Sequence, residues 1–287
     1  MKSIFKGLLS LLLIVPLCLS AQKGKKDADT EDAAGTTFIT GSLQLDEKGK
    51  LFFASSDCRY NGKYYLAGSS LEGLDKKDAK KMKKKNKAVD KKIAKFTKKV
   101  TKADGKILPN REVKCLIDEK ANTINPIKVI SPMYEPKVTG TAPLCDATLL
   151  AIYALYVETE RIKKMTRVVT FKKIKTDGDT EEMEFYDINC NKIGYDQLTT
   201  MMPEIKSVLK QANIALAANI AAVAIVLANQ KAISEELKAL GGLETIMGMK
   251  SLVEAGVFQV RLVNDNKRLR DRIKECKKVL KGFGFED

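Results

Sequence analysis

The sequence contains no histidine and no tryptophan among its 287 residues. The absence of histidine excludes Ser-His-Asp triads, Cys-His catalytic pairs and HExxH zinc sites, because each of them needs an imidazole. The sequence also lacks a GxxxxGK[ST] phosphate loop, a GxGxxG loop after a predicted strand, and any CxxC pair. These absences favour a binding or structural protein over an enzyme, and nothing in the pattern indicates a cofactor or a metal.

One catalytic pattern remains, in which Ser207 and Lys210 have the S-x-x-K spacing of penicillin-binding proteins. No SDN or KTG motif accompanies it, and the same spacing recurs at Ser3/Lys6 and Ser20/Lys23, as chance would produce in a lysine-rich chain. A Ser/Lys hydrolase is therefore the last of three interpretations. The acidic segment 177–182 does not follow the EF-hand pattern, and we interpret it as a solvated hairpin turn.

The N-terminus has the three-part order of a secretory signal peptide. Lys2 and Lys6 precede an apolar run of about 12 residues, which ends at the small residues Ser20 and Ala21. Such a run is shorter than the ~20 residues of a membrane-spanning helix. We therefore expect residues 1–21 to be removed, residues 22–36 to form a disordered leader, and the product to reach the periplasm or cell envelope, or to be secreted.

Export would place the cysteines in an oxidising compartment, where disulfides persist. Four of them lie in the part of the chain with few predicted helices and can pair in three ways that the sequence does not rank: Cys58, Cys115, Cys145 and Cys190. Buried thiols throughout are the alternative. The fifth, Cys276, is left over.

Positive charge is concentrated in one segment. The formal net charge is +15, and residues 76–102 alone carry 14 lysines against Asp78 and Asp90. In this segment Ala79, Met82, Asn86, Val89, Ile93, Phe96 and Val100 recur at spacings of three and four, which predicts an amphipathic helix over about 75–103. We expect its lysines to bind an anionic membrane or envelope surface, or an acidic protein, whereas nucleic acid fits an exported chain poorly. The predicted binding residues are Lys76, Lys77, Lys80, Lys81, Lys83, Lys84, Lys85, Lys87, Lys91, Lys92, Lys95, Lys98, Lys99 and Lys102. The alternative is that the apolar stripe packs on its own domain and the lysines are merely solvated.

The rest of the chain predicts an α+β protein, mainly α. Short β-rich runs separated by turn signals begin at Thr37, and a further strand is expected at 111–118. Four prolines make 122–145 extended, Asp146 begins a helix to about Met165, and a hairpin follows. We therefore divide the mature chain into an α+β region, 37–195, and a C-terminal bundle of about three helices, 196–287. The expected helices span 203–240, 243–255 and a last segment to about Leu280.

Two helical segments suggest partners. Residues 212–228 are alanine-rich and uncharged, so they fit a buried bundle helix or, as the alternative function, a membrane-inserting one. The last helix carries a heptad seam formed by Leu262, Asn266, Leu269, Ile273, Cys276 and Leu280. This seam predicts either a parallel homodimer, with Cys276 facing its twin, or packing against the alanine-rich helix of the same chain.

Overall fold

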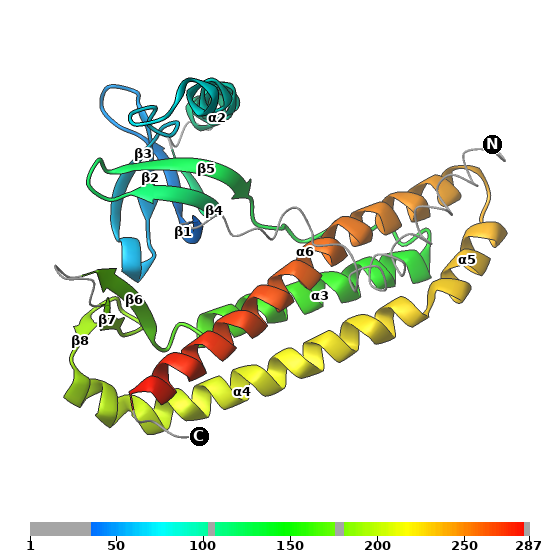
Figure 1. The fold of residues 1–287 in the computed structure, drawn as a ribbon. Coiled ribbons are helices and arrows are strands. Elements are labelled where there is room, and N and C mark those ends of the chain that lie inside the picture. The colour runs from blue at the N-terminus through cyan, green and yellow to red at the C-terminus, as the bar shows by residue number, and fades with distance from the viewer. Residues whose placement is uncertain (1–35, 103–106, 176–180, 284–287) are drawn as a thin grey trace. The chain divides into compact units, whose positions relative to one another are not determined.

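The computed structural model describes residues 36–102, 107–175 and 181–283, and the predicted signal peptide and almost all of the leader lie outside them. The protein is α+β and mainly helical (Figure 1). It divides into two compact units, 1–132 and 133–287, each of which is described by itself. The predicted boundary at 195/196 was set by the long C-terminal helices, whereas the units meet at 132/133, because helix 143–165 packs with those helices.

Unit 1 is a closed five-stranded barrel. Its strands are β1 (Thr36–Leu45), β2 (Leu51–Ser55), β3 (Gly62–Leu66), β4 (Ile107–Asp118) and β5 (Thr123–Ile130), in the order β1-β2-β3-β5-β4. Neighbouring strands are antiparallel except β3 and β5, which pair in parallel, and β1 closes the barrel on β4. A short 3-10 helix, η1 (Cys58–Tyr60), lies between β2 and β3.

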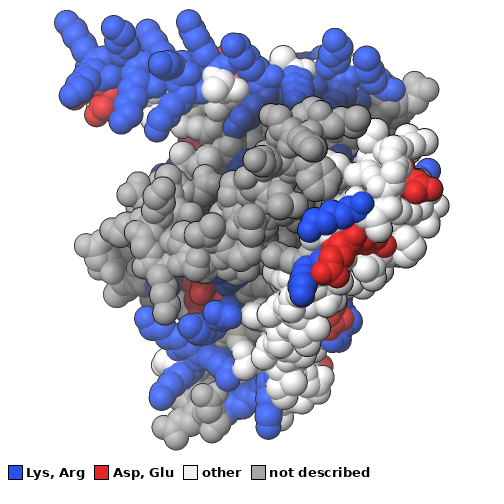
Figure 2. All heavy atoms as spheres, turned by 90° about the vertical axis from the view of Figure 1, so that its right-hand side faces the viewer, with Lys and Arg blue, Asp and Glu red and all other residues white. Residues whose placement is uncertain are grey.

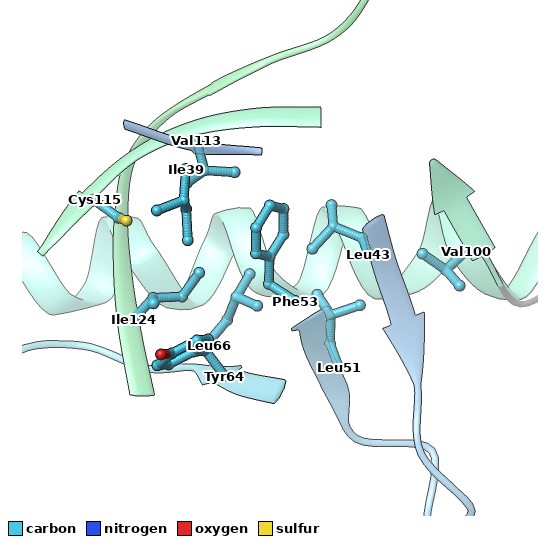
Figure 3. Packing of buried hydrophobic residues seen from close by; sticks show 10 residues of the cluster. All are labelled: Ile39, Leu43, Leu51, Phe53, Tyr64, Leu66, Val100, Val113, Cys115 and Ile124. Carbon is cyan, nitrogen blue, oxygen red and sulfur yellow. The ribbon is translucent and has the colours of Figure 1, made fainter. Parts of the chain in front are cut away.

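The barrel interior is filled by alternate residues of the strands. Ile39 and Leu43 of β1, Phe53 of β2 and Val113 of β4 are almost completely buried in one apolar cluster (Figure 3). The period of two that this requires is already visible in the β1 sequence. The interior is therefore a packed core, and it leaves the outer faces of the strands and the covering helix as the possible binding surfaces.

Helix α2 (Lys76–Lys102) connects β3 to β4. It confirms the predicted amphipathic helix to within a residue at each end. Pro126 lies within β5, where the pairing with β4 shifts register between Lys114 and Cys115. A bulge accommodates a proline, which cannot donate a ladder hydrogen bond.

Unit 2 contains the other helices and a small sheet. The helices are α3 (Pro143–Met165), α4 (Tyr195–Ala228), α5 (Gln230–Ala239) and α6 (Gly242–Gly282). The antiparallel strands β6 (Thr170–Lys175), β7 (Glu181–Tyr186) and β8 (Lys192–Ile193) contain the predicted hairpin. Phe185 and Ile193 pack with Leu198, Ile205 and Leu280, so the sheet covers the end of the helices where α4 begins and α6 ends.

Four expected helix boundaries are wrong. Helix α4 begins at Tyr195 rather than at Pro203, which lies inside the helix. The helix expected over 203–240 is two helices that meet at Asn229. Residues 243–280, expected as two helices, form the single helix α6, which continues through Gly256 without a break. Finally, α3 begins at Pro143 rather than at Asp146, and its N-terminal amides are capped by Glu236 of α5.

Candidate anionic-surface interface

Helix α2 is started and ended by local signals. The Asp75 carboxylate accepts a hydrogen bond from the Asp78 amide at 2.7 Å, which is the geometry of an N-cap. Lys99 and Lys102 lie in the last turn, where the partial negative charge of the helix end favours cations. The segment therefore forms a helix in spite of the mutual repulsion of its lysines.

The apolar stripe of α2 packs on the barrel. Val100 is part of the barrel core, and Ile93 and Phe96 pack against the same cluster. Val89 is buried as well. The predicted stripe is therefore confirmed as a contact within unit 1, which means that these side chains are already covered and cannot enter a lipid layer while α2 stays docked.

Polar contacts fix the position of the helix along the barrel. Asn86 Oδ1 accepts from the Ser69 amide at 3.0 Å, and Asn86 Nδ2 donates to the Ser69 carbonyl at 2.9 Å. Gly68 makes room for this pair, since a Cβ there would lie 2.5 Å from Asn86 Cγ. Sequence reasoning placed Asn86 in the stripe without giving it a role. The signal was an amide at an otherwise apolar position.

Lys92 also holds α2 in place. Its Nζ donates to the Ile127 carbonyl at 2.6 Å and lies 3.5 Å from the Pro126 carbonyl. Both carbonyls lie in β5 beside the register shift at its proline. Lys92 is therefore a docking residue, and of the fourteen predicted binding lysines it is the one that is not exposed.

The remaining thirteen lysines of α2 are exposed and carry uncompensated charge. Within the part of the chain that the structure describes, no lysine of α2 takes part in an ion pair. Asp78 and Asp90 are the only acidic residues of the helix. Figure 2 shows the resulting rim of Lys and Arg side chains, with little acidic surface among them. The structure therefore brings these lysines together on one element of unit 1.

The outer face of β2 and β3 is a second candidate surface, because aromatic rings there could stack on a base or a sugar. Phe52 and Tyr65 are paired across the two strands. Their rings are occupied, since Lys63 Nζ lies 5.4 Å from the Phe52 centroid and Lys50 Nζ lies 4.3 Å from that of Tyr65. A base or sugar would have to displace these cations before it could stack, so the geometry favours α2.

The predicted C-terminal seam is buried within unit 2. All six of its residues are buried, and they pack against both α3 and α4. Asn266 Oδ1 accepts from Thr159 Oγ1 of α3 at 3.1 Å. The structure thus follows the intrachain interpretation, with α3 as an additional partner, and a dimer through this seam would require the unit to open.

The alanine-rich segment of α4 has one buried side, formed by Ala212, Leu216, Asn219 and Val223. Four other alanines of the segment, which recur at spacings of three and four, are exposed: Ala217, Ala221, Ala224 and Ala228. By length and composition alone, α4 is the one helix among the described residues that could cross a membrane, and 22% of its apolar window is buried.

Among the described cysteines, Cys58 and Cys190 are disulfide-bonded, whereas Cys115, Cys145 and Cys276 are buried thiols. Neither Cys115 nor Cys145 therefore takes part in a bridge. Burial raises the pKa of both thiols to about 12. A disulfide is typical of an oxidising compartment.

Comparisons with known proteins leave the surface of α2 as the main guide to function: no family model, no curated protein and no solved structure matches this chain.

Proposed function

We propose that the protein is an exported binding or structural protein of the cell envelope, which contacts anionic partners through α2. One observation carries the proposal: α2 is docked by its apolar stripe, by Asn86 and by Lys92, while thirteen lysines remain exposed without ion pairs. Among the residues that the structure describes, no acidic side chain forms an ion pair with this positive charge. An anionic partner would neutralise it, with each lysine contributing about 1 kcal/mol at an acidic surface.

Chromatography on immobilised heparin tests this proposal. We expect the full chain to be retained at low salt and to elute as the salt screens the lysines. A variant of α2 with Lys→Gln at Lys80, Lys87, Lys91 and Lys98 should elute at clearly lower salt. These four lysines lie in one row along the helix, so we name it the row variant. Glutamine keeps a good helix propensity, so α2 should remain folded.

A matched control removes the same charge elsewhere. The scattered variant carries Lys→Gln at four exposed lysines outside α2: Lys120, Lys137, Lys231 and Lys250. We expect it to elute close to the wild type. No retention of the wild type, or equal shifts for the two variants, would contradict a binding role for α2.

A second candidate function is insertion of residues 212–228 into a membrane, which the length and apolar composition of α4 favour. Insertion would remove Leu216 and Asn219 from the core that they form with α3 and α6. It would therefore need unit 2 to open. Vesicle association that resists high salt and is accompanied by dye leakage would support this second candidate over the first.

A further inference from the structure

The exposed lysines of α2 are not spread evenly around the helix. At 3.6 residues per turn, eight of them lie within about 45° of the direction opposite the apolar stripe. Their spacings are three and four throughout, so they form one line along the side of α2 that points away from the barrel. This lysine row consists of Lys77, Lys80, Lys84, Lys87, Lys91, Lys95, Lys98 and Lys102.

The lysine row is long and straight, and all of its side chains carry positive charge. From Lys77 to Lys102 it extends for about 38 Å at 1.5 Å per residue. Asp78 and Asp90 both fall outside it, and so does Phe96, the only aromatic residue of α2, which packs on the barrel. The row therefore offers charge along a line, and no aromatic ring on which a base could stack.

The helix that carries the row is held rigidly. Val89 and Val100 are buried, Asn86 pairs with both backbone groups of Ser69, and Lys92 reaches the carbonyls of β5. These contacts are distributed from the second quarter of the helix to its last turn. The row is therefore a preformed rod, and the apolar side chains that insertion into lipid would need lie on its opposite side.

We propose that the lysine row lies flat on a bilayer that contains acidic lipids and adheres there by charge alone, without insertion. The proposal rests on the proposed function of α2 and names its partner. A bilayer presents anionic headgroups everywhere in a plane, so all eight lysines can be neutralised at once. Duplex DNA completes a turn in about 34–36 Å, so a straight row of this length would meet the phosphates over only part of its extent.

Co-sedimentation with vesicles tests the orientation. The full chain is mixed with vesicles of phosphatidylcholine alone or with added phosphatidylglycerol, at physiological salt. We expect binding only with the acidic lipid, complete release in high salt, and no leakage of a trapped dye. The row variant should bind more weakly by roughly 10³-fold, at the usual contribution of a lysine near acidic lipid.

A shoulder variant is the matched control. It carries Lys→Gln at four exposed lysines of the same helix that lie beside the row: Lys76, Lys81, Lys83 and Lys99. Their ammonium groups are farther from the bilayer by about one helix radius, which is a large part of a Debye length. We therefore expect only about 30-fold weaker binding for this variant, although its net charge equals that of the row variant.

The outcomes separate this inference from the proposed function. Retention on heparin without binding to acidic vesicles would leave the function standing and overturn the lipid partner. Equal losses in the row and shoulder variants would overturn flat docking, and salt-resistant binding with dye leakage would overturn adhesion without insertion. Tighter binding to duplex DNA than to vesicles at the same salt would indicate nucleic acid. No retention on any anionic material would remove both proposals.

Discussion

At the scale of single residues, Asn219 occupies an unusual place in the helical core of unit 2. It is 3% exposed, and its Nδ2 donates to Thr159 Oγ1 at 2.7 Å and to the Leu155 carbonyl at 3.2 Å. Asn266 Oδ1 approaches the same amide at 3.5 Å. These contacts join α3, α4 and α6 at the same level along the three helices. A buried amide of this kind fixes the register of helices that apolar contacts alone would leave free to slide.

We expect Asn219→Ala to destabilise unit 2 by about 1–3 kcal/mol, because it leaves buried polar groups of α3 without their donor. Urea denaturation followed by the helical signal measures this change. Asn213→Ala, on the exposed side of the same helix, is the control and should change the stability by less than about 0.5 kcal/mol. Equal effects of the two substitutions would show that the polar cluster contributes no specific stability.

Asp265 is a second buried polar residue, and it makes stability depend on pH. It is 1% exposed, and Lys163 Nζ lies 2.9 Å from its Oδ2, while Arg268 pairs with Oδ1. Burial would raise the pKa of this carboxyl, but the charges and hydrogen bonds of Lys163 and Arg268 outweigh burial and hold it below its ordinary value. The ionised carboxylate therefore contributes stability at pH values above its unfolded pKa of about 3.9, and this contribution is lost as the pH falls through the lower folded-state pKa.

We expect Asp265→Asn to cost about 3 kcal/mol at pH 7, since it leaves cations at a buried site. As the pH is lowered from 5 towards 2, the wild type should lose stability more steeply than the variant, so the gap between them should narrow. Urea midpoints at a series of pH values test this expectation. Asp271→Asn, at an exposed position of α6, is the control and should change the stability at pH 7 by less than about 0.5 kcal/mol.

At the scale of elements, α3 shows a cap that comes from far along the chain. Glu236 of α5 accepts hydrogen bonds from the amides of Leu144 and Cys145, at 2.8 and 3.0 Å. Asp146, which the sequence suggested as the cap, is buried and instead accepts from Ser251 Oγ at 2.6 Å and from the Gly140 amide at 2.8 Å. The short helix α5 thus closes the end of unit 2 at which α3 begins.

Removing the Glu236 carboxylate should therefore weaken the docking of α5. We expect Glu236→Ala to cost about 0.5–2 kcal/mol, the range for the loss of a helix cap, and to speed hydrogen exchange at the start of α3. Glu235→Ala removes a neighbouring, exposed carboxylate and should do neither. If exchange at Leu144 and Cys145 stayed unchanged in Glu236→Ala, the cap would be energetically irrelevant.

At the scale of the whole molecule, the cysteines report on both the core and the compartment. With Cys58 and Cys190 disulfide-bonded, the described part of the chain has three thiols, all of them buried. We expect alkylation of the native protein at pH 8 to be slow, because the thiolate forms of Cys115 and Cys145 are disfavoured by pKa values of about 12.

Mass spectrometry after unfolding tests the same pattern. Without a reductant, three cysteines of the mature chain should be alkylated, and with a reductant five. A fourth alkylated residue before reduction, at Cys18, would show that the predicted signal peptide had not been removed. Complete alkylation without a reductant would show that no disulfide is formed. The proposal of export would then lose the support that the disulfide gives it.

The sequence by itself determined the β-rich runs that begin at Thr37, the strand around 111–118, the lysine-rich helix with its apolar stripe, the hairpin after the helix that ends near Met165, and the α+β class. These features depend on local periodicity, turn residues and charge spacing, which act over a few neighbouring positions. Only the tertiary structure decided that the barrel closes through β3 and β5, that the seam of α6 faces α3 as well as α4, and that Glu236 caps α3. It also decided which cysteines stay reduced and which side of α2 faces outward. Each of these features depends on contacts between residues far apart in the chain. The spacing of neighbouring residues does not show which of these distant contacts form.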